Sequence, residues 1–418
     1  MMQKQLTTLS NGLRIITDPV DSVESVALGI WADVGTRNED LTHNGVAHMT
    51  EHMLFNGTQT RNAQQIVKAV ENVGGQMNAF TSREMTAYYV HLLKEDARLA
   101  LDILSDMVLH STFPDTEVEK ERGIITQEIA MTTDTPDDHV FDLYQCIAYP
   151  DQALGAPILG TTEIIQNMPR QALVDYVDNF YTNDNLIISA AGNINHDDLC
   201  AWAEAQFQSS QRAMKDNLKP AAYQGGIVQE TRELEQSHFV IGYQGIAKTD
   251  DQYYAAVLLA MVLGGGMSSR LFQSVREKHG LAYSIYAAHS AFKDDGQFEI
   301  YAGTSFDKVG RCTDLIAKEL QSICAEGINE TELSRAKAQM KSGILMSQES
   351  MMARANRQAK HLINFGKALD LQNIIQRIDA IQAADIQNMT VKIFATKATI
   401  AHLGAAEHDF ASAIPLAA

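Results

Sequence analysis

Two histidines, His48 and His52, stand four positions apart in the segment 45–55, and Glu51 directly precedes the second one. On a helix at about 100° per residue, their imidazoles lie about 40° apart and one turn from each other, so both can bind one metal ion from the same side. Glu51 lies beside that face and can reach a metal-bound water without being a ligand. This pattern predicts a zinc site with His48 and His52 as ligands and Glu51 as the general base.

A histidine pair at this spacing is more commonly a surface feature or a satisfied core pair, and a catalytic zinc needs a third protein ligand. Glu128, on a separate expected helix, is the candidate for that ligand. Glu121 shares the helix face of Glu128 and is placed to orient a ligand from behind. On their pattern alone, these two glutamates are more typical of a solvated helix face, so the third ligand stays open at this point.

The elements that must position these residues alternate between strands and helices, and the same order runs through the chain twice. In the first half we expect strands at 25–34, 77–80 and 87–92 and helices at 45–55, 63–73, 95–109 and 117–131. In the second half we expect strands at 239–243, 282–287 and 298–302 and helices at 252–263, 271–278, 309–323 and 332–346. The duplication predicts an α+β fold of two homologous half-chain domains, each a mostly antiparallel sheet covered by helices.

The expected domains are an N-terminal domain at 1–207, which carries the candidate zinc site, and a C-terminal domain at 227–418. The segment 208–226 between them is polar and contains Pro220 and two adjacent glycines, so it is interpreted as a linker. The stretch 259–267, which matches the histidine pair of the first half, has neither His nor Glu. The second domain is therefore expected to lack a metal site.

The composition excludes some function classes. With 52 acidic and 33 basic side chains, the net charge of −19 repels nucleic acid and anionic membranes, although it can attract cationic peptides or serve only solubility. The four cysteines have no CxxC spacing, so neither a disulfide framework nor a thiolate zinc site is expected. Reduced thiols fit a cytosolic protein better.

The N-terminal residues show neither an apolar signal core nor an Arg-rich amphipathic leader. An Asn-Gly turn at Asn11 and Gly12 leads directly into a strand-like segment, so folded structure is expected to begin almost at once. No apolar run reaches the length of about 18 residues that spans a bilayer. A cytoplasmic location without membrane insertion is the resulting expectation.

Several motifs in order make the chain recognisable. His-x-x-Glu-His is the inverzincin motif, in which the zincin order is reversed. Over nearly its whole length the chain resembles the pitrilysin and mitochondrial processing peptidase family, in particular its shorter, processing-peptidase-like branch. The matching segments are residues 45–55, 74–75, 78–84, 121–128, 136–138, 159–160, 263–272 and 276–283.

The resemblance implies one zinc ion per chain, held by His48, His52 and Glu128, with Glu51 as base and Glu121 in a supporting role. It also implies a substrate-binding edge strand. The residues of that strand are Asn78, Ala79 and Phe80, to which a peptide would add its backbone as a further strand.

Arg276 and Tyr283 match a C-terminal arginine–tyrosine pair that, in related enzymes, contacts the substrate backbone and the developing oxyanion. A guanidinium and a phenol are suitable donors for such charge. Without the resemblance, the two residues would be interpreted as ordinary packing and solvation. Because this one chain carries both the metal motif and the pair, it departs from family members that divide them between subunits.

The function expected from the resemblance is a zinc metalloendopeptidase that cleaves short or unfolded peptides. Two half-chain domains would form one arm of a clamshell, and two chains would close it as a homodimer. The alternatives are a catalytically silent core or assembly subunit and an obligate half of a heterodimeric processing peptidase. The intact metal motif argues against the silent subunit.

Overall fold

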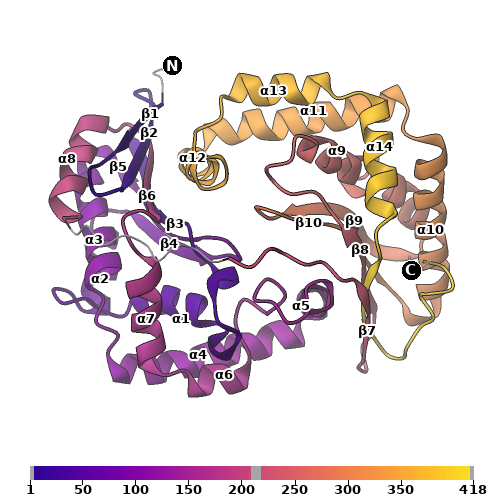
Figure 1. The fold of residues 1–418 in the computed structure, drawn as a ribbon, viewed down its shortest axis with the longest axis horizontal. Coiled ribbons are helices and arrows are strands. Elements are labelled where there is room, and N and C mark those ends of the chain that lie inside the picture. The colour runs from indigo at the N-terminus through magenta and orange to yellow at the C-terminus, as the bar shows by residue number, and fades with distance from the viewer. Residues whose placement is uncertain (1–3, 209–217, 415–418) are drawn as a thin grey trace. The chain divides into compact units, whose positions relative to one another are not determined.

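The structure, a computed structural model, describes residues 4–208 and 218–414 of the chain. The described residues fall into two compact units, and each unit has a β-sheet packed between helices (Figure 1). The first unit is drawn from Met1–Ala130, Pro157–Lys219 and Leu345–Ala368, and the second from Met131–Ala156, Pro220–Ile344 and Leu369–Ala418. The predicted α+β class is confirmed.

The sheet of the first unit has six strands among the described residues, in the order β1-β2-β6-β3-β5-β4. They are β1 (Gln5–Thr8), β2 (Arg14–Pro19), β3 (Ser25–Ala32), β4 (Gln76–Thr81), β5 (Thr86–Leu93) and β6 (Leu186–Gly192). Only β2 and β6 pair in parallel within this set; the other neighbours are antiparallel. Helices cover both faces, so the central strands β3 and β6 are buried and apolar almost throughout instead of alternating with polar residues.

The helices of the first unit divide between the two faces of its sheet. They are α1 (Val46–Leu54), α2 (Ala63–Glu71), α3 (Ala97–His110), α4 (Asp115–Asp134), α6 (Thr162–Asn167), α7 (Arg170–Phe180), α8 (His196–Gln206) and α12 (Met351–Phe365). Leu28 and Ile30 of β3 face the core formed with α1, α3 and α8, whereas Ala27 and Trp31 face α12. Polar contacts fix α12 in place: the Gln358 amide donates to the Ala190 carbonyl at 2.8 Å and to Ser189 Oγ at 2.9 Å.

The sheet of the second unit repeats the topology of the first. Its described strands follow the order β7-β11-β8-β10-β9, which matches β2-β6-β3-β5-β4, and the first two again pair in parallel. They are β7 (Gly226–Thr231), β8 (Ser237–Gln244), β9 (Ala282–Ala291), β10 (Gly296–Thr304) and β11 (Thr399–Gly404). The shared order supports the duplication seen in the sequence.

The second unit has corresponding helices. They are α5 (Pro136–Ala148), α9 (Tyr253–Gly264), α10 (Val309–Glu326), α11 (Glu330–Met346), α13 (Leu371–Ala380) and α14 (Ala383–Phe394). The helix expected at 271–278 forms, but as a π-helix over Phe272–Lys278. The wider π turn is a local backbone geometry that the apolar spacing of such a short segment does not encode.

The two halves of the chain exchange one helix each. Helix α5 follows α4 in the first half of the sequence, yet it packs on β8 and β11 of the second unit. Helix α12, its counterpart after α11, packs on β3 and β6 of the first unit. The compact units therefore differ from contiguous half-chains. The division into 1–207, 208–226 and 227–418 stays a prediction, and residues 209–217 of the expected linker lie outside the described residues.

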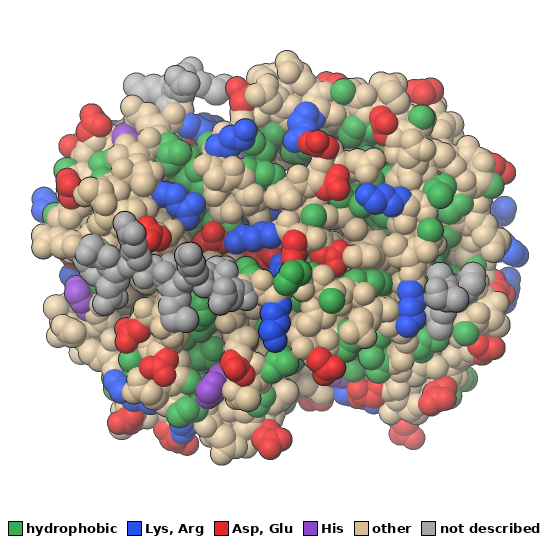
Figure 2. Space-filling model, in the orientation of Figure 1, with side chains coloured by type: hydrophobic (Ala, Val, Ile, Leu, Met, Phe, Trp, Pro, Cys, Tyr) green, Lys and Arg blue, Asp and Glu red, His purple; other side chains and the backbone are tan. Residues whose placement is uncertain are grey.

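Acidic and basic side chains are interspersed on the face drawn in Figure 2, and hydrophobic side chains are exposed singly or in small groups. On this face the acidic side chains do not gather into a single acidic field. In the described part of the chain, no helix is both long and apolar enough to cross a membrane.

Candidate metal centre

Helix α1 presents the predicted metal motif on one of its sides. Its apolar residues, among them Met49 and Met53, are fully buried in the core of the first unit. His48, Glu51 and His52 lie on the opposite, partly exposed side. One side of α1 therefore packs in the core, and this packing leaves the polar side chains on the side that is partly exposed to solvent.

The two imidazoles converge with a carboxylate from α4. His48 Nε2 lies 3.9 Å and His52 Nε2 lies 3.8 Å from Glu128 Oε2, and the two rings are 4.6 Å apart. Of the described His, Cys, Asp and Glu residues, only these three form a group that could hold a metal ion. Zinc bonds to nitrogen and oxygen are about 2.0–2.2 Å long, so one ion can reach donor atoms about 4 Å apart. The donor set therefore fits zinc, with two neutral nitrogens and one carboxylate.

Glu121 supports His52 from behind. The Glu121 side chain is 7% exposed, and its Oε2 lies 3.0 Å from His52 Nδ1, while Asn56 donates to its Oε1 at 3.0 Å. A carboxylate on one ring nitrogen selects the tautomer whose other nitrogen, Nε2, is free to bind a metal. The structure thus brings Glu121, for which the family resemblance implied a supporting role, beside the candidate ligand His52.

The predicted base Glu51 has a partner on the neighbouring edge strand. Thr81 Oγ1 of β4 donates a hydrogen bond of 2.5 Å to Glu51 Oε2. Burial raises the pKa of Glu51, and the hydrogen bond from Thr81 and the charge of His52 oppose this effect. Motif spacing pointed to Glu51 alone. Thr81 was missed as its partner because the packing of α1 on β4 is a tertiary feature.

The two histidines differ electrostatically. Burial, with help from the neighbouring His52, lowers the pKa of His48 to about 4. Burial also acts to lower the pKa of His52, but the Glu121 hydrogen bond and nearby carboxylates outweigh it and raise the pKa. His48 Nδ1 is buried and has no hydrogen-bond partner among the described residues. A neutral His48 has its Nε2 lone pair available for a cation.

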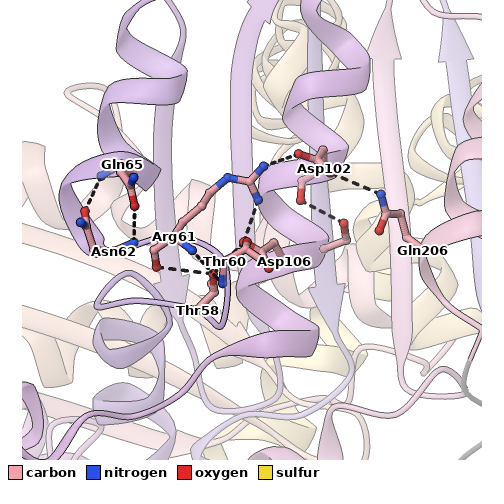
Figure 3. Close-up of polar contacts among 9 residues, drawn as sticks. Thr58, Thr60, Arg61, Asn62, Gln65, Asp102, Asp106 and Gln206 are labelled. Carbon is pink, nitrogen blue, oxygen red and sulfur yellow. Dashed lines mark hydrogen bonds and ion pairs between the residues drawn. The ribbon is translucent and has the colours of Figure 1, made fainter.

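The segment after α1 is fixed by a polar network to α3 (Figure 3). Asp106 Oδ2 accepts hydrogen bonds from Thr58 Oγ1, Thr60 Oγ1 and Arg61 Nη1 at 2.7, 2.8 and 2.7 Å. Arg61 also pairs with Asp102 at 2.5 Å. These contacts hold the segment between α1 and α2 against α3, which packs on the sheet.

Two glycines allow the start of α1 to lie close to another loop. Gly45 has φ of +93°, and a Cβ there would lie 2.7 Å from the Leu159 carbonyl oxygen. Gly160 has φ of +77°, and its Cβ would lie 2.4 Å from the Asn44 carbonyl oxygen. Side chains are excluded at both positions. The sequence motif at 159–160 is thereby explained by its close backbone contact with the N-terminus of α1.

The predicted substrate strand lies beside α1. Asn78, Ala79 and Phe80 belong to β4, which pairs only with β5 among the described strands and so has one open edge. Asn78 is exposed, and Ala79 and Phe80 are partly exposed. This open edge lies next to the helix that carries Glu51, and on it the Ala79 N–H donates to Asn78 Oδ1 at 2.8 Å.

Arg276 and Tyr283 lie together in the second unit. The Arg276 guanidinium carbon is 5.4 Å from the centre of the Tyr283 ring, and 77% of Tyr283 is exposed. Tyr283 stands near the start of edge strand β9, and Arg276 is on the π-helix before it. The candidate ligands belong to the first unit. The helix that corresponds to α1, namely α9, has neither His nor Glu.

A duplicated α+β scaffold with two histidines and a glutamate in one half is the arrangement of a metallopeptidase, and comparison with known proteins specifies the family. A model of the insulinase family (peptidase family M16) matches residues 14–162, and a model of the peptidase M16 inactive domain matches residues 167–340. The chain belongs to the M16 peptidase family, which confirms the resemblance seen in the sequence. The description of the second domain as inactive agrees with the observation that the one group of candidate metal ligands among residues 4–208 and 218–414 lies in the first unit.

Relatives match over almost the whole chain. A Rickettsia felis protein named as an uncharacterized zinc protease is 39% identical over 403 residues, covering 96% of this chain and 97% of the relative. A Bacillus subtilis protein, named as the uncharacterized zinc protease YmxG, is 38% identical over 388 residues, covering 93% and 95%. The crystal structure of a protease from Helicobacter pylori has a TM-score of 0.90 at 21% identity, covering 96% of this chain and 99% of that one. The last likeness shows the shared fold.

Proposed function

We propose that this chain is a zinc metalloendopeptidase that hydrolyses short or unfolded peptides. The observation that carries the proposal is the convergence of His48, His52 and Glu128, whose ligand atoms all lie within 4.8 Å of one another. Membership of the M16 family and the relatives named as zinc proteases support zinc as the metal. We propose one ion per chain, which is supported by the single such group among the described residues.

Bound zinc supplies a Lewis acid that polarises a peptide carbonyl and acidifies water. Glu51 is the base in this proposal: it takes a proton from the attacking water and then delivers that proton to the leaving amine. Its position supports the role, because it lies on the partly exposed side of α1 with His48 and His52 and accepts a hydrogen bond from Thr81. Glu121 orients His52.

A peptide substrate would extend the sheet of the first unit at β4. The open edge at Asn78 and Ala79 supports this mode, since backbone hydrogen bonds to an edge strand need no particular side chain in the peptide. Because β4 also holds Thr81, a peptide on this edge would lie close to Glu51. Extended, unfolded segments suit this mode, because their backbone N–H and C=O groups are free to pair with an edge strand.

Arg276 and Tyr283 would donate to the substrate backbone and to the developing oxyanion. We place them in the site of a partner chain, as part of a homodimer whose two clamshell arms enclose a chamber. The high exposure of Tyr283 supports this, because a phenol that is 77% exposed beside a guanidinium has donors available for another molecule.

Two alternatives make distinct predictions. A silent assembly subunit would bind no zinc and cleave nothing, and half of a heterodimer would bind zinc yet cleave only with its partner. The experiment is metal analysis and peptide cleavage on the purified chain alone. One zinc per chain with cleavage supports the proposal, whereas zinc without cleavage favours the heterodimer. A chain that binds no zinc when zinc is supplied would rule the proposal out.

A further inference from the structure

Glu39 is a buried carboxylate at the beginning of the metal helix that the proposed mechanism does not use. Its Oε1 accepts a hydrogen bond from Ala47 N at 2.8 Å. Its Oε2 accepts from Gly45 N at 3.0 Å and from the Asn44 side-chain amide at 2.9 Å. The residue is only 8% exposed. Both oxygens therefore act as acceptors, and all three donors stand at the N-terminus of α1.

The start of α1 needs such an external acceptor. The first N–H groups of a helix have no partner within it, and a side chain at the N-cap commonly binds them. Asn62 does so for α2 and Thr161 for α6. The N-cap of α1 is Gly45, where the positive φ and the contact with Leu159 exclude a side chain. Glu39 supplies the side-chain acceptor for these N–H groups that a glycine at the N-cap cannot supply.

The first turn of α1 contains a metal-ligand candidate. The helix begins at Val46, so His48 is its third residue and lies next to Ala47, whose N–H binds Glu39. His52 is one turn further on and is held separately by Glu121. Fraying of the first turn would therefore displace His48 while leaving His52 in place.

Stability alone does not account for Glu39. Burial raises the pKa of Glu39 to about 7, although the N–H groups of Gly45 and Ala47 and the Asn44 amide act to lower it. Keeping the carboxylate ionised in this place thus costs folding free energy at neutral pH. A carboxylate buried in this place and bonded to the turn that carries a candidate ligand fits a role in the site.

We propose that Glu39 is a positioning residue of the metal centre, whose carboxylate fixes the first turn of α1 and thereby the ligand atom of His48. This inference rests on the proposed zinc site. It assigns the three ligand-bearing positions three different supports: Glu39 for the turn of His48, Glu121 for His52, and the packing of α4 for Glu128.

The test compares Glu39→Gln with the wild-type full-length protein. The glutamine amide keeps the size but turns one acceptor into a donor that faces a backbone N–H. We expect zinc affinity, measured by competition with a chromophoric chelator, to fall about 10- to 100-fold, as for other residues that orient metal ligands. The visible spectrum of the cobalt-substituted variant should also change, since the ligand geometry around the ion changes.

The matched control is Asp18→Asn. Asp18 is a buried carboxylate of the same unit, 2% exposed, and pairs with Arg354 at 2.7 Å away from α1. Its loss should lower the melting temperature but leave zinc affinity and the cobalt spectrum unchanged. A variant that is only less stable thus shows a lower melting temperature alone, whereas a variant with displaced ligands also shows a changed zinc affinity and cobalt spectrum.

A folded Glu39→Gln protein with wild-type zinc affinity and cobalt spectrum would overturn the inference. Should that variant fail to fold, Glu39→Asp takes its place, because it keeps the charge and withdraws the carboxylate by one methylene. It should bind zinc more weakly than wild type, and unchanged affinity would overturn the inference equally. If the wild-type protein itself binds no zinc, the proposed function fails, which is a separate and recognisable outcome.

Discussion

Thr81 of the edge strand β4 donates a 2.5 Å hydrogen bond to Glu51 of α1, the helix that carries the candidate ligands His48 and His52. The strand proposed to receive the peptide therefore holds the residue proposed to act as base. In Thr81→Val the hydroxyl is lost at nearly constant shape. A hydrogen bond to a charged group contributes about 1.5–3 kcal/mol, so kcat should fall on the order of 10- to 100-fold while KM changes little.

Thr81→Ser is the control for this prediction. It keeps the hydroxyl and should restore most of kcat, and zinc content should be normal in both variants. If Thr81→Val kept wild-type kcat, or if Thr81→Ser were equally impaired, the hydroxyl would have no part in orienting Glu51.

The ligand assignment predicts a loss of metal from each of three variants. His48→Ala, His52→Ala and Glu128→Gln should each lower zinc occupancy after dialysis, because each removes or weakens one of three protein donors. Glu119→Gln is a matched control, since Glu119 is an exposed glutamate of the same helix that pairs with Arg122. Full zinc affinity in Glu128→Gln would mean that another residue is the third ligand.

The dimer proposal predicts complementation between two inactive proteins. If Tyr283 completes the site of the partner chain, a mixed dimer of Glu51→Gln and Tyr283→Phe has one intact site and one with both lesions. Random exchange makes half the dimers mixed, so about a quarter of wild-type activity should return, assuming that the sites act independently. Mixing Glu51→Gln with the double variant should restore none. No recovery despite measured subunit exchange would exclude the arrangement in trans.

The raised pKa of Glu39 predicts a specific pH dependence of the folding stability of the zinc-free protein. Its pKa is raised from 4.5 to about 7 on folding, so between these values the folded state keeps a proton that the unfolded chain has released. The contribution of Glu39 to the free energy of unfolding is fully present below pH about 4.5 and is lost as the pH rises through about 7. The loss amounts to about 3 kcal/mol.

Urea unfolding of wild type and Glu39→Gln between pH 5 and pH 8 measures this effect as a difference. The stability of wild type relative to the variant should decrease as the pH rises, because only wild type loses the proton. A difference that stays constant over this range would contradict the raised pKa.

The sequence predicted the parts of this fold that depend on local pattern. The apolar side of α1 and the spacing of His48 and His52 are both set by helical period, so the structure has them where the pattern placed them. The repeated order of strands and helices likewise matched two sheets of the same topology. The resemblance to the family then identified Glu128 as the third ligand candidate. The residues around Glu128 in the sequence do not by themselves distinguish it from a solvated glutamate.

Features that depend on tertiary contacts were missed. Nothing in the sequence of α5 or α12 indicates that each packs on the sheet of the other half. Apolar spacing shows that one side of a helix is buried, but it does not show which element covers that side. Thr81 was missed for the same reason, because it acts through one hydrogen bond to a residue 30 positions away. Glu39 bonds three groups only five to eight positions further on, but the loop geometry that brings them together has no periodic pattern in the sequence. The glycine at residue 45 was a visible signal, since a helix that starts at a glycine with a nearby acidic residue needs a cap from outside.

The central claim is that Glu51 is a base and not a ligand. It is tested most directly by measuring zinc content and peptide cleavage together in Glu51→Gln and in wild type. The account predicts that the variant folds, keeps one zinc per chain, and cleaves on the order of 10²- to 10⁴-fold more slowly. A folded variant that loses its zinc, or one that cleaves at the wild-type rate, would contradict it.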